Sequence, residues 1–156
     1  MIAITTKIPE MSVHVVIHSE KKEMKTTELF DGKTILFGLP GAFSPTCSQI
    51  QLPGFANQEK ALRDKGYTNI ICMSVNDPFV MHAWKEQVAP TANIIMLADG
   101  SGLFTKALGV ELDLTTKNMG VRCTRFLLVA EKGIVTRMDV ESNPSVCSVS
   151  GVSSLL

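Results

Sequence analysis

The most informative absences in this chain of 156 residues concern charge, long apolar runs and close cysteine pairs. The 15 Lys and Arg residues balance the 15 Asp and Glu residues, so we expect neither a nucleic-acid partner nor a membrane partner. No apolar run approaches the roughly 18 residues that a transmembrane helix needs. The first residues, MIAITTKIPE, lack the pattern of a secretory signal. We therefore expect a cytoplasmic protein, or an organellar one if a targeting segment precedes Met1.

Close cysteine pairs are also absent. The four cysteines are Cys47, Cys72, Cys123 and Cys147, and none forms a C-x-x-C pair. Structural zinc sites usually contain such pairs, so we expect no metal site. Because 45% of the residues are hydrophobic, the chain can bury a sizeable core without disulfide bonds. The general expectation for each cysteine is a buried thiol in a reducing compartment.

The length favours a single domain over residues 1–156, and the apolar pattern predicts its class. Apolar runs predict strands at residues 13–18, 34–39, 69–75, 93–98 and 126–130. Helical periodicity predicts helices at residues 53–65, 78–88 and 102–108. Lys132-Gly133 predicts a C-terminal antiparallel hairpin, with Ile134, Thr136, Met138 and Val140 on one face of its second strand. This order is typical of an α/β, thioredoxin-like fold, with a central mixed β-sheet flanked by helices.

The segment that ends at Cys47 directly follows the predicted strand 34–39. Ser44 is a favourable N-cap and Pro45 then occupies the first helical position, so Cys47 falls in the first turn. Free N–H groups and the helix dipole stabilise a thiolate there, and the thiolate is the nucleophile. The Ser44 hydroxyl is either only a cap or also a donor to an oxygen-bearing substrate. Pro53 should kink or interrupt this helix.

Several motifs in this chain match one known family. The spacing Pro40-x-x-x-Ser44-x-x-Cys47 matches the peroxiredoxin signature P-x-x-x-[T/S]-x-x-C. The longer string PGAFSPTCSQIQLPGF resembles the peroxiredoxin V group, also called type II peroxiredoxins, whose usual form is PGAFTPTCS followed by LPGF. SVND at 74–77 and G-V-R-x-x-R-F at 120–126 match in the same order. The resemblance covers nearly the whole chain.

The resemblance implies a thioredoxin-like fold and a thiol peroxidase that uses no metal, haem or other cofactor. Cys47 is implied to be the peroxidatic cysteine, which attacks a peroxide oxygen and becomes a sulfenic acid. Ser44 is implied to hydrogen-bond the peroxide and Pro40 to shield the thiolate from water. Arg125 matches the catalytic arginine, whose charge stabilises the thiolate and the developing charge on the peroxide. The family usually has Thr at position 44, where serine lacks the methyl group that restricts the rotamer.

The group with which the sulfenic acid reacts next is open at this point. Cys147 resembles the C-terminal resolving cysteine of animal peroxiredoxin V enzymes and lies in a Ser-rich tail that we expect to be mobile. Cys72 is either a resolving cysteine, as assigned in some plant forms, or a buried core thiol. Cys123 is either an ordinary strand cysteine or a thiol whose pKa the neighbouring arginines lower. An external thiol is the remaining possibility.

The resemblance also implies substrates and partners. We expect reduction of hydrogen peroxide and small alkyl hydroperoxides, with peroxynitrite as a further substrate, and electrons from thioredoxin, glutaredoxin or glutathione. Type II members commonly form homodimers near the active site, so Phe43, Phe79 and Trp84 are expected to edge the pocket or a dimer interface.

Two functions are alternatives to the peroxidase. The first is a redox sensor or relay with little sustained turnover, and the second is a noncatalytic binding module. The complete set of Pro40, Ser44, Cys47 and Arg125 argues against the binding module, which has no chemical need for all four.

Overall fold

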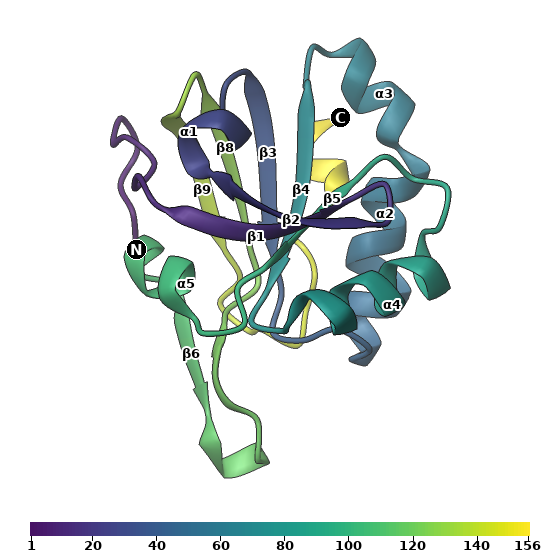
Figure 1. The fold of residues 1–156 in the computed structure, drawn as a ribbon, viewed down its shortest axis with the longest axis vertical. Coiled ribbons are helices and arrows are strands. Elements are labelled where there is room, and N and C mark those ends of the chain that lie inside the picture. The colour runs from purple at the N-terminus through teal and green to yellow at the C-terminus, as the bar shows by residue number, and fades with distance from the viewer.

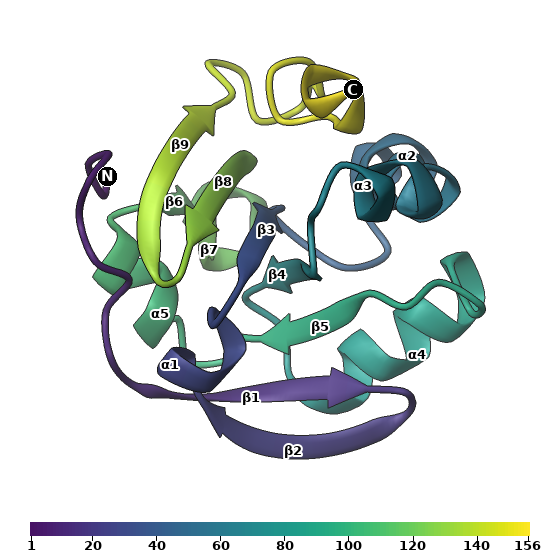
Figure 2. The same cartoon turned by 90° about the horizontal axis from the view of Figure 1, so that it is seen from above.

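The computed structural model describes residues 1–156 and contains a seven-stranded mixed sheet with the order β2-β1-β5-β4-β3-β8-β9 (Figures 1 and 2). Its strands are β1 (Ser12–Ile17), β2 (Glu20–Lys25), β3 (Lys33–Gly38), β4 (Asn69–Ser74), β5 (Ile95–Ala98), β8 (Phe126–Glu131) and β9 (Ile134–Val140). β3, β4 and β5 run parallel, and the other neighbouring strands are antiparallel. A separate two-stranded antiparallel sheet consists of β6 (Glu111–Leu114) and β7 (Gly120–Cys123).

Helices cover both faces of the large sheet (Figure 2). They are α1 (Thr26–Leu29), α2 (Leu52–Asn57), α3 (Glu59–Asp64), α4 (Pro78–Val88) and α5 (Leu103–Leu108). A π-helical turn spans Cys47–Gln51, and 3-10 turns span Thr115–Lys117 and Val152–Leu155. α2, α3 and α4 lie on one face, and α1 and α5 lie on the other (Figure 2). The predicted thioredoxin-like architecture is confirmed.

The middle parts of the central strands are apolar because both of their faces are buried. In β3, Ile35 and Phe37 pack in the cluster that contains α2, α3 and α4, whereas Leu36 packs with α1 and α5. Phe37 stacks on Phe55 of α2 with 4.0 Å between the ring centroids. Successive strand residues point to opposite faces, so a strand between two helical layers needs a continuous apolar run, as predicted for residues 34–39.

Two predicted elements differ in detail from the structure. The helix predicted at 53–65 is divided into α2 and α3, because the backbone leaves helical geometry at Gln58 (φ −107°, ψ 14°). The predicted face of the C-terminal hairpin is wrong, because a β-bulge shifts the register between β8 and β9 and leaves Thr136 as an extra residue. Val135 is therefore buried in the same cluster against which Met138 and Val140 pack.

Three strands, β2, β6 and β7, were not predicted, and β2 escaped because polar residues dominate it. β2 is an edge strand with the sequence EKKEMK, and only its Met24 packs against the core. Charges on an edge strand are expected, because they oppose pairing with another sheet. β6 and β7 form an arm (residues 111–123) that projects from the large sheet (Figure 1).

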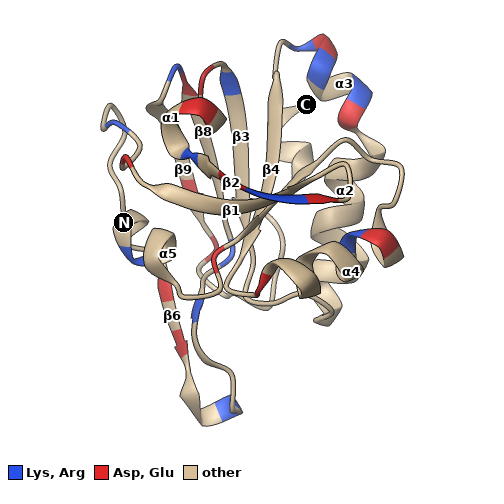
Figure 3. Ribbon diagram, in the orientation of Figure 1, with Lys and Arg blue, Asp and Glu red and all other residues tan.

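Charged residues of both signs are mixed along β2, α3 and α4 rather than separated into patches (Figure 3). This distribution agrees with the zero net charge. None of the helices has the length and apolar character that crossing a membrane requires.

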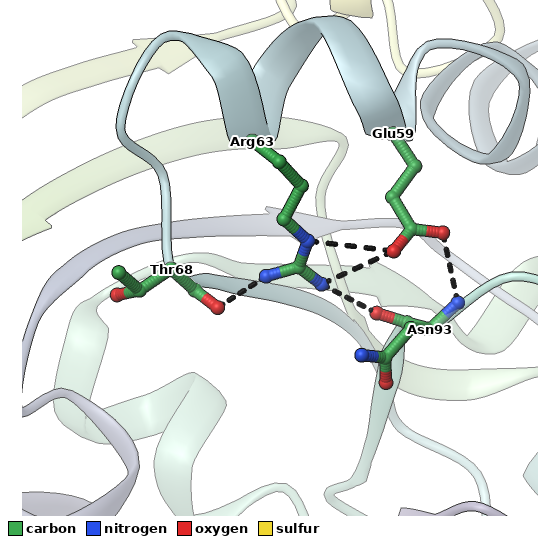
Figure 4. Close-up of polar contacts among 4 residues, drawn as sticks. All are labelled: Glu59, Arg63, Thr68 and Asn93. Atoms are coloured by element: carbon green, nitrogen blue, oxygen red, sulfur yellow. Dashed lines mark hydrogen bonds and ion pairs between the residues drawn. The ribbon is translucent and has the colours of Figure 1, made fainter.

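A polar cluster ties α3 to the loops before β4 and β5 (Figure 4). Glu59 accepts a hydrogen bond from Arg63 at 3.3 Å and one from the Asn93 amide at 2.9 Å. Arg63 also donates to the carbonyl oxygens of Asn93 and Thr68. The cluster fixes the helix that follows the segment containing Cys47.

The segment after β9 is held by one buried carboxylate. Glu141 is 5% exposed and accepts four hydrogen bonds, from the amides of Ser148 and Ser150 at 2.7 and 2.8 Å and from their hydroxyls at 2.7 and 2.5 Å. Burial by itself raises the pKa of this carboxyl, but the hydrogen bonds from Ser150 and Ser148 stabilise the ionised form and bring the pKa down to about 2. The Ser-rich tail expected to be mobile is therefore anchored.

This carboxylate predicts a particular dependence of stability on pH. The folded-state pKa is lowered, so the stabilisation is complete above the usual value of 4.5 and is lost as the pH falls towards about 2. We expect Glu141→Gln to lower the free energy of unfolding at pH 7 by about 2 to 3 kcal/mol. The difference from wild type should shrink below about pH 4.5.

Denaturant titrations at a series of pH values measure both quantities. Glu59→Gln is the matched control, since Glu59 also accepts a backbone hydrogen bond but lies outside this segment. The same pH dependence in wild type and Glu141→Gln would contradict the assignment.

Candidate active site

The loop before Cys47 is fixed by the end of the neighbouring strand β4. Leu39, which follows β3, donates its amide to the Met73 carbonyl at 3.1 Å. The Asn76 side-chain oxygen accepts from the Ala42 amide at 3.0 Å and from the Ser74 hydroxyl at 2.6 Å. Asn76 belongs to the SVND motif, and these two hydrogen bonds give that motif a structural role: it holds the loop at the carboxyl end of β3.

Cys47 lies in the first turn of the helical segment that begins at Pro45, as predicted. The Ser44 carbonyl accepts the Ser48 amide at 2.9 Å, and the Leu52 amide then bonds to the Cys47 carbonyl in a wider π turn. Pro53 has no N–H, and its ring would clash with the carbonyl four residues earlier in a regular α-helix. The wider turn avoids this clash, so the predicted interruption at Pro53 is confirmed.

The Ser44 side chain does not cap this turn, so that part of the prediction is wrong. Its hydroxyl donates to the Gly41 carbonyl oxygen at 2.7 Å and closes the loop on itself. The proton of Ser44 is therefore engaged, while the lone pairs of Oγ are available as acceptors.

Arg125 provides a positive charge at the Cys47 sulfur. It lies in the link between β7 and β8 and is 2% exposed. Its Nη2 donates to Cys47 Sγ at 3.1 Å, and its Nε donates to the Pro144 carbonyl oxygen at 2.9 Å. Cys47 is fully buried. A guanidinium that donates a hydrogen bond to a buried sulfur stabilises negative charge on it far more than it would in water.

Gln51 orients Arg125 and was missed by the sequence analysis. The Gln51 side chain is buried, and its Oε1 accepts from Arg125 Nη1 at 2.5 Å. Its Nε2 lies 3.4 Å from the Gly38 carbonyl oxygen and 3.5 Å from that of Ser150. Residues four apart share one side of a helix, so the spacing between Cys47 and Gln51 was a usable signal.

A cleft of about 330 Å³ is lined by Arg125, the residue that contacts the Cys47 sulfur. Its lining includes Pro40 and Ser44 of the loop before Cys47, and Leu112, Leu114 and Met119 of the arm. The structure thus brings together the four residues that the sequence pointed to, Pro40, Ser44, Cys47 and Arg125.

A larger cleft of about 710 Å³ lies at the ends of β4 and β5 and contains none of these four residues. It is lined by Asn76 but not by Arg125, the residue that contacts the reactive sulfur. We therefore place the chemistry in the smaller cleft.

Cys72 and Cys123 are enclosed in the protein. Burial, first of all, raises the pKa of the Cys72 thiol well above its usual value. Cys123 donates its thiol to the Leu39 carbonyl oxygen at 3.1 Å, and burial raises its pKa to about 12. The suggestion that neighbouring arginines lower the pKa of Cys123 is therefore wrong, because the Arg125 guanidinium points to Cys47.

Cys147 is the only half-buried cysteine, and all four are free thiols. Its Sγ lies 3.9 Å from the Ser150 hydroxyl. Burial raises the pKa of Cys147, although Ser150 and the charge of Arg125 act in the opposite direction.

Of the three aromatic residues expected near the pocket or an interface, Trp84 is placed differently. It is fully buried, and its Nε1 donates to Ser48 Oγ at 2.9 Å, which anchors the turn after Cys47 to α4. Phe43 and Phe79 are exposed. The structure has no group of three or more His, Cys, Asp or Glu side chains arranged to hold a metal ion.

Comparison with known proteins agrees with this geometry. The Redoxin family model matches residues 4–156. The chain is 47% identical over 124 residues to Peroxiredoxin-2C of Oryza sativa subsp. japonica, covering 80% of this chain and 76% of that protein. It is 51% identical over 110 residues to Peroxiredoxin-2B of Arabidopsis thaliana, covering 70% and 68%.

A solved structure is similar over almost the whole chain. Reduced Prx3 from Vibrio vulnificus in complex with H2O2 matches with a TM-score of 0.91 and 38% identity, covering 99% of this chain and 97% of that one. The resemblance deduced from the motif around Cys47 is thereby confirmed. The chain belongs to the peroxiredoxin family, in its type II group, and is a thiol-dependent peroxidase.

Proposed function

We propose that this peroxidase reduces hydrogen peroxide and small alkyl hydroperoxides, with peroxynitrite as a further substrate, through a sulfenic acid at Cys47. The observation that carries the proposal is the 3.1 Å contact between Cys47 Sγ and Nη2 of Arg125, which also lines the cleft. The hydrogen peroxide bound in the similar Vibrio vulnificus structure supports the choice of substrate.

In the first step the Cys47 thiolate attacks one peroxide oxygen and the O–O bond breaks. The sulfur is oxidised to a sulfenic acid, and the other oxygen takes a proton and leaves as water or an alcohol. Arg125 stabilises charge that moves from sulfur to the departing oxygen. The Ser44 hydroxyl continues to donate its hydrogen bond to the Gly41 carbonyl oxygen, and its oxygen accepts a hydrogen bond from the peroxide O–H. Pro40 limits the access of water.

The walls of the cleft support alkyl hydroperoxides as well as hydrogen peroxide. Leu112, Leu114 and Met119 line the same cleft as Pro40. Apolar contact with an alkyl group contributes to binding in proportion to the area removed from water. The arm thus provides the part of the site that distinguishes an alkyl hydroperoxide from hydrogen peroxide.

We propose Cys147 as the resolving cysteine in preference to Cys72. Cys72 is fully buried in β4, which is hydrogen-bonded to a strand on each side. Cys147 is half-buried in a segment that contacts Arg125 and Gln51. Its thiol attacks the Cys47 sulfenic acid, and the products are a disulfide and water. Thioredoxin, glutaredoxin or glutathione then reduces the disulfide.

The remaining proposals concern assembly, compartment and domain organisation. Phe43 and Phe79 are 49% and 71% exposed, and such exposed aromatic side chains support a homodimer. Four free thiols suit a reducing compartment such as the cytoplasm. We propose that residues 1–156 act as one domain, since both core clusters share the seven-stranded sheet.

The role of Cys47 is tested by peroxide consumption in stopped flow. We expect Cys47→Ser to slow consumption at least a thousandfold, because the nucleophile is lost. Cys147→Ser is the matched variant: it should consume one equivalent at the wild-type rate and then stop turning over with thioredoxin. Equal, slow consumption by Cys47→Ser and wild type would overturn the proposal.

The role of Arg125 is tested by Arg125→Lys, which keeps the charge but loses the fork of donors. We expect kcat/KM for hydrogen peroxide to fall by about 10- to 100-fold, as for the loss of one charge-assisted hydrogen bond. Arg137→Lys is the control, because Arg137 pairs with Asp139 away from the cleft. A wild-type kcat/KM in Arg125→Lys would contradict the assigned role.

Substrate selectivity is tested by Leu114→Ala. We expect kcat/KM for cumene hydroperoxide to fall about three- to tenfold, because apolar contact is lost, and kcat/KM for hydrogen peroxide to stay within twofold. Val121→Ala serves as control, because Val121 is exposed on the same arm but does not line the cleft. A parallel loss for both substrates would show that Leu114 acts on the fold of the arm instead.

A further inference from the structure

The four hydrogen bonds that Glu141 accepts come from Ser148 and Ser150, which follow Cys147 closely in the chain. We call Glu141, Ser148 and Ser150 the latch. Ser148 follows Cys147 directly, and both its amide and its hydroxyl bond to the carboxylate. Ser150 does the same two residues later. The backbone on the C-terminal side of Cys147 is thus fastened to a buried charge at the end of β9.

The Cys147 thiol faces into the turn that the latch closes. Its Sγ lies 3.9 Å from Ser150 Oγ, and a Cβ atom at Gly151 would come within 3.3 Å of it. The same Ser150 hydroxyl donates to Glu141 at 2.5 Å. The latch therefore holds the thiol among residues of its own segment, while Cys47 is fully buried beneath Arg125.

The closed segment is also fastened to the active site at three points. The carbonyl oxygens of Pro144, Ser145 and Ser150 accept from Arg125, Thr46 and Gln51. The bond from Gln51 is long and the bond from Thr46 is exposed. The four bonds to Glu141 are short and charge-assisted, and the two from Ser150 are buried. Glu141 is thus the strongest single restraint on the segment that carries Cys147.

We propose that Glu141 is a positioning residue for the second half of the reaction: the closed latch keeps Cys147 in its turn, and opening of the latch sets the rate at which Cys147 reaches the Cys47 sulfenic acid. This proposal rests on the proposed role of Cys147 as resolving cysteine. The sulfur of Cys147 attacks the sulfenic sulfur, the S–O bond breaks, and the hydroxide leaves as water with the thiol proton.

The latch also determines what else the sulfenic acid can meet. While the latch is closed, the Cys47 sulfenic acid persists and is available to an external thiol or to a second peroxide, which oxidises it to sulfinic acid. Once the latch opens, the disulfide removes the sulfenic acid from both reactions. The strength of the latch thus sets the division between resolution, transfer to a partner thiol and overoxidation.

The test compares single turnovers of wild type, Glu141→Gln and Ser148→Ala. Reduced protein is mixed with one equivalent of hydrogen peroxide, quenched by alkylation at short intervals, and analysed by intact mass and disulfide mapping. The rate of sulfenic acid formation is measured on the same samples, so that the rate of disulfide formation can be compared between variants independently of the first step. Ser148→Ala removes one hydroxyl from an exposed position and keeps the test informative if Glu141→Gln does not fold.

We expect the Cys47–Cys147 disulfide to form about tenfold faster in Glu141→Gln and about threefold faster in Ser148→Ala, in the order of the hydrogen bonds weakened. The sulfinic acid formed under excess peroxide should fall in the same order. Glu59→Gln is the matched control: it loosens α3 and should leave the resolving rate unchanged.

An unchanged or slower resolving rate in both latch variants would overturn the latch while leaving Cys147 as resolving cysteine. Equal acceleration in Glu59→Gln would also overturn it, because general destabilisation would then explain the effect. The absence of a Cys47–Cys147 disulfide in every protein would overturn both the resolving role and the latch. Peroxide consumption that still depends on Cys47 would show in that case that the peroxidase itself stands.

Discussion

The contact between the Arg125 guanidinium and the Cys47 sulfur is the constraint around which the rest of this molecule is arranged. A thiol that is to react as a thiolate in a fully buried position needs a compensating charge, because an unpaired buried ion is costly. Arg125 provides that charge, with its Nη2 3.1 Å from the sulfur. Its Nε and Nη1 donate to Pro144 and Gln51, and these two hydrogen bonds orient the guanidinium. The arrangement requires the link between β7 and β8 to lie against the first turn after β3.

Two buried side chains, Arg125 and Glu141, are supported by neutral dipoles. Gln51 holds Arg125 with an amide, and Glu141 is held by amides and hydroxyls of two serines. Because hydrogen bonds are directional, each charged side chain also fixes the position of the backbone segment that bonds to it. The C-terminal segment is in this way built into the active site, and the chemistry of Cys47 depends on residues close to the end of the chain.

The active-site motif could be predicted because its determinants are local. The order strand, proline-containing loop and helix start is fixed by residues within one short stretch, so the position of Cys47 in the first turn followed from Pro45 and the spacing. Arg125 could be selected only through the family resemblance, since 78 residues separate it from Cys47 and no local pattern links them. The predicted role of Ser44 as an N-cap was wrong. A serine hydroxyl can either accept from a helical amide or donate to a nearby carbonyl, here that of Gly41, and local sequence does not distinguish the two.

The sequence by itself determined the fold class, the buried strands and the reactive cysteine, because apolar periodicity and turn chemistry act over a few residues. Only the tertiary structure decided which side chains meet. It placed Gln51 between Arg125 and the C-terminal segment, enclosed Cys123, and anchored a Ser-rich tail that composition had suggested would be mobile. The physical reason is that hydrogen bonds between distant segments depend on distances that the packing of the sheet and helices sets, and these are not encoded in the local spacing of residues.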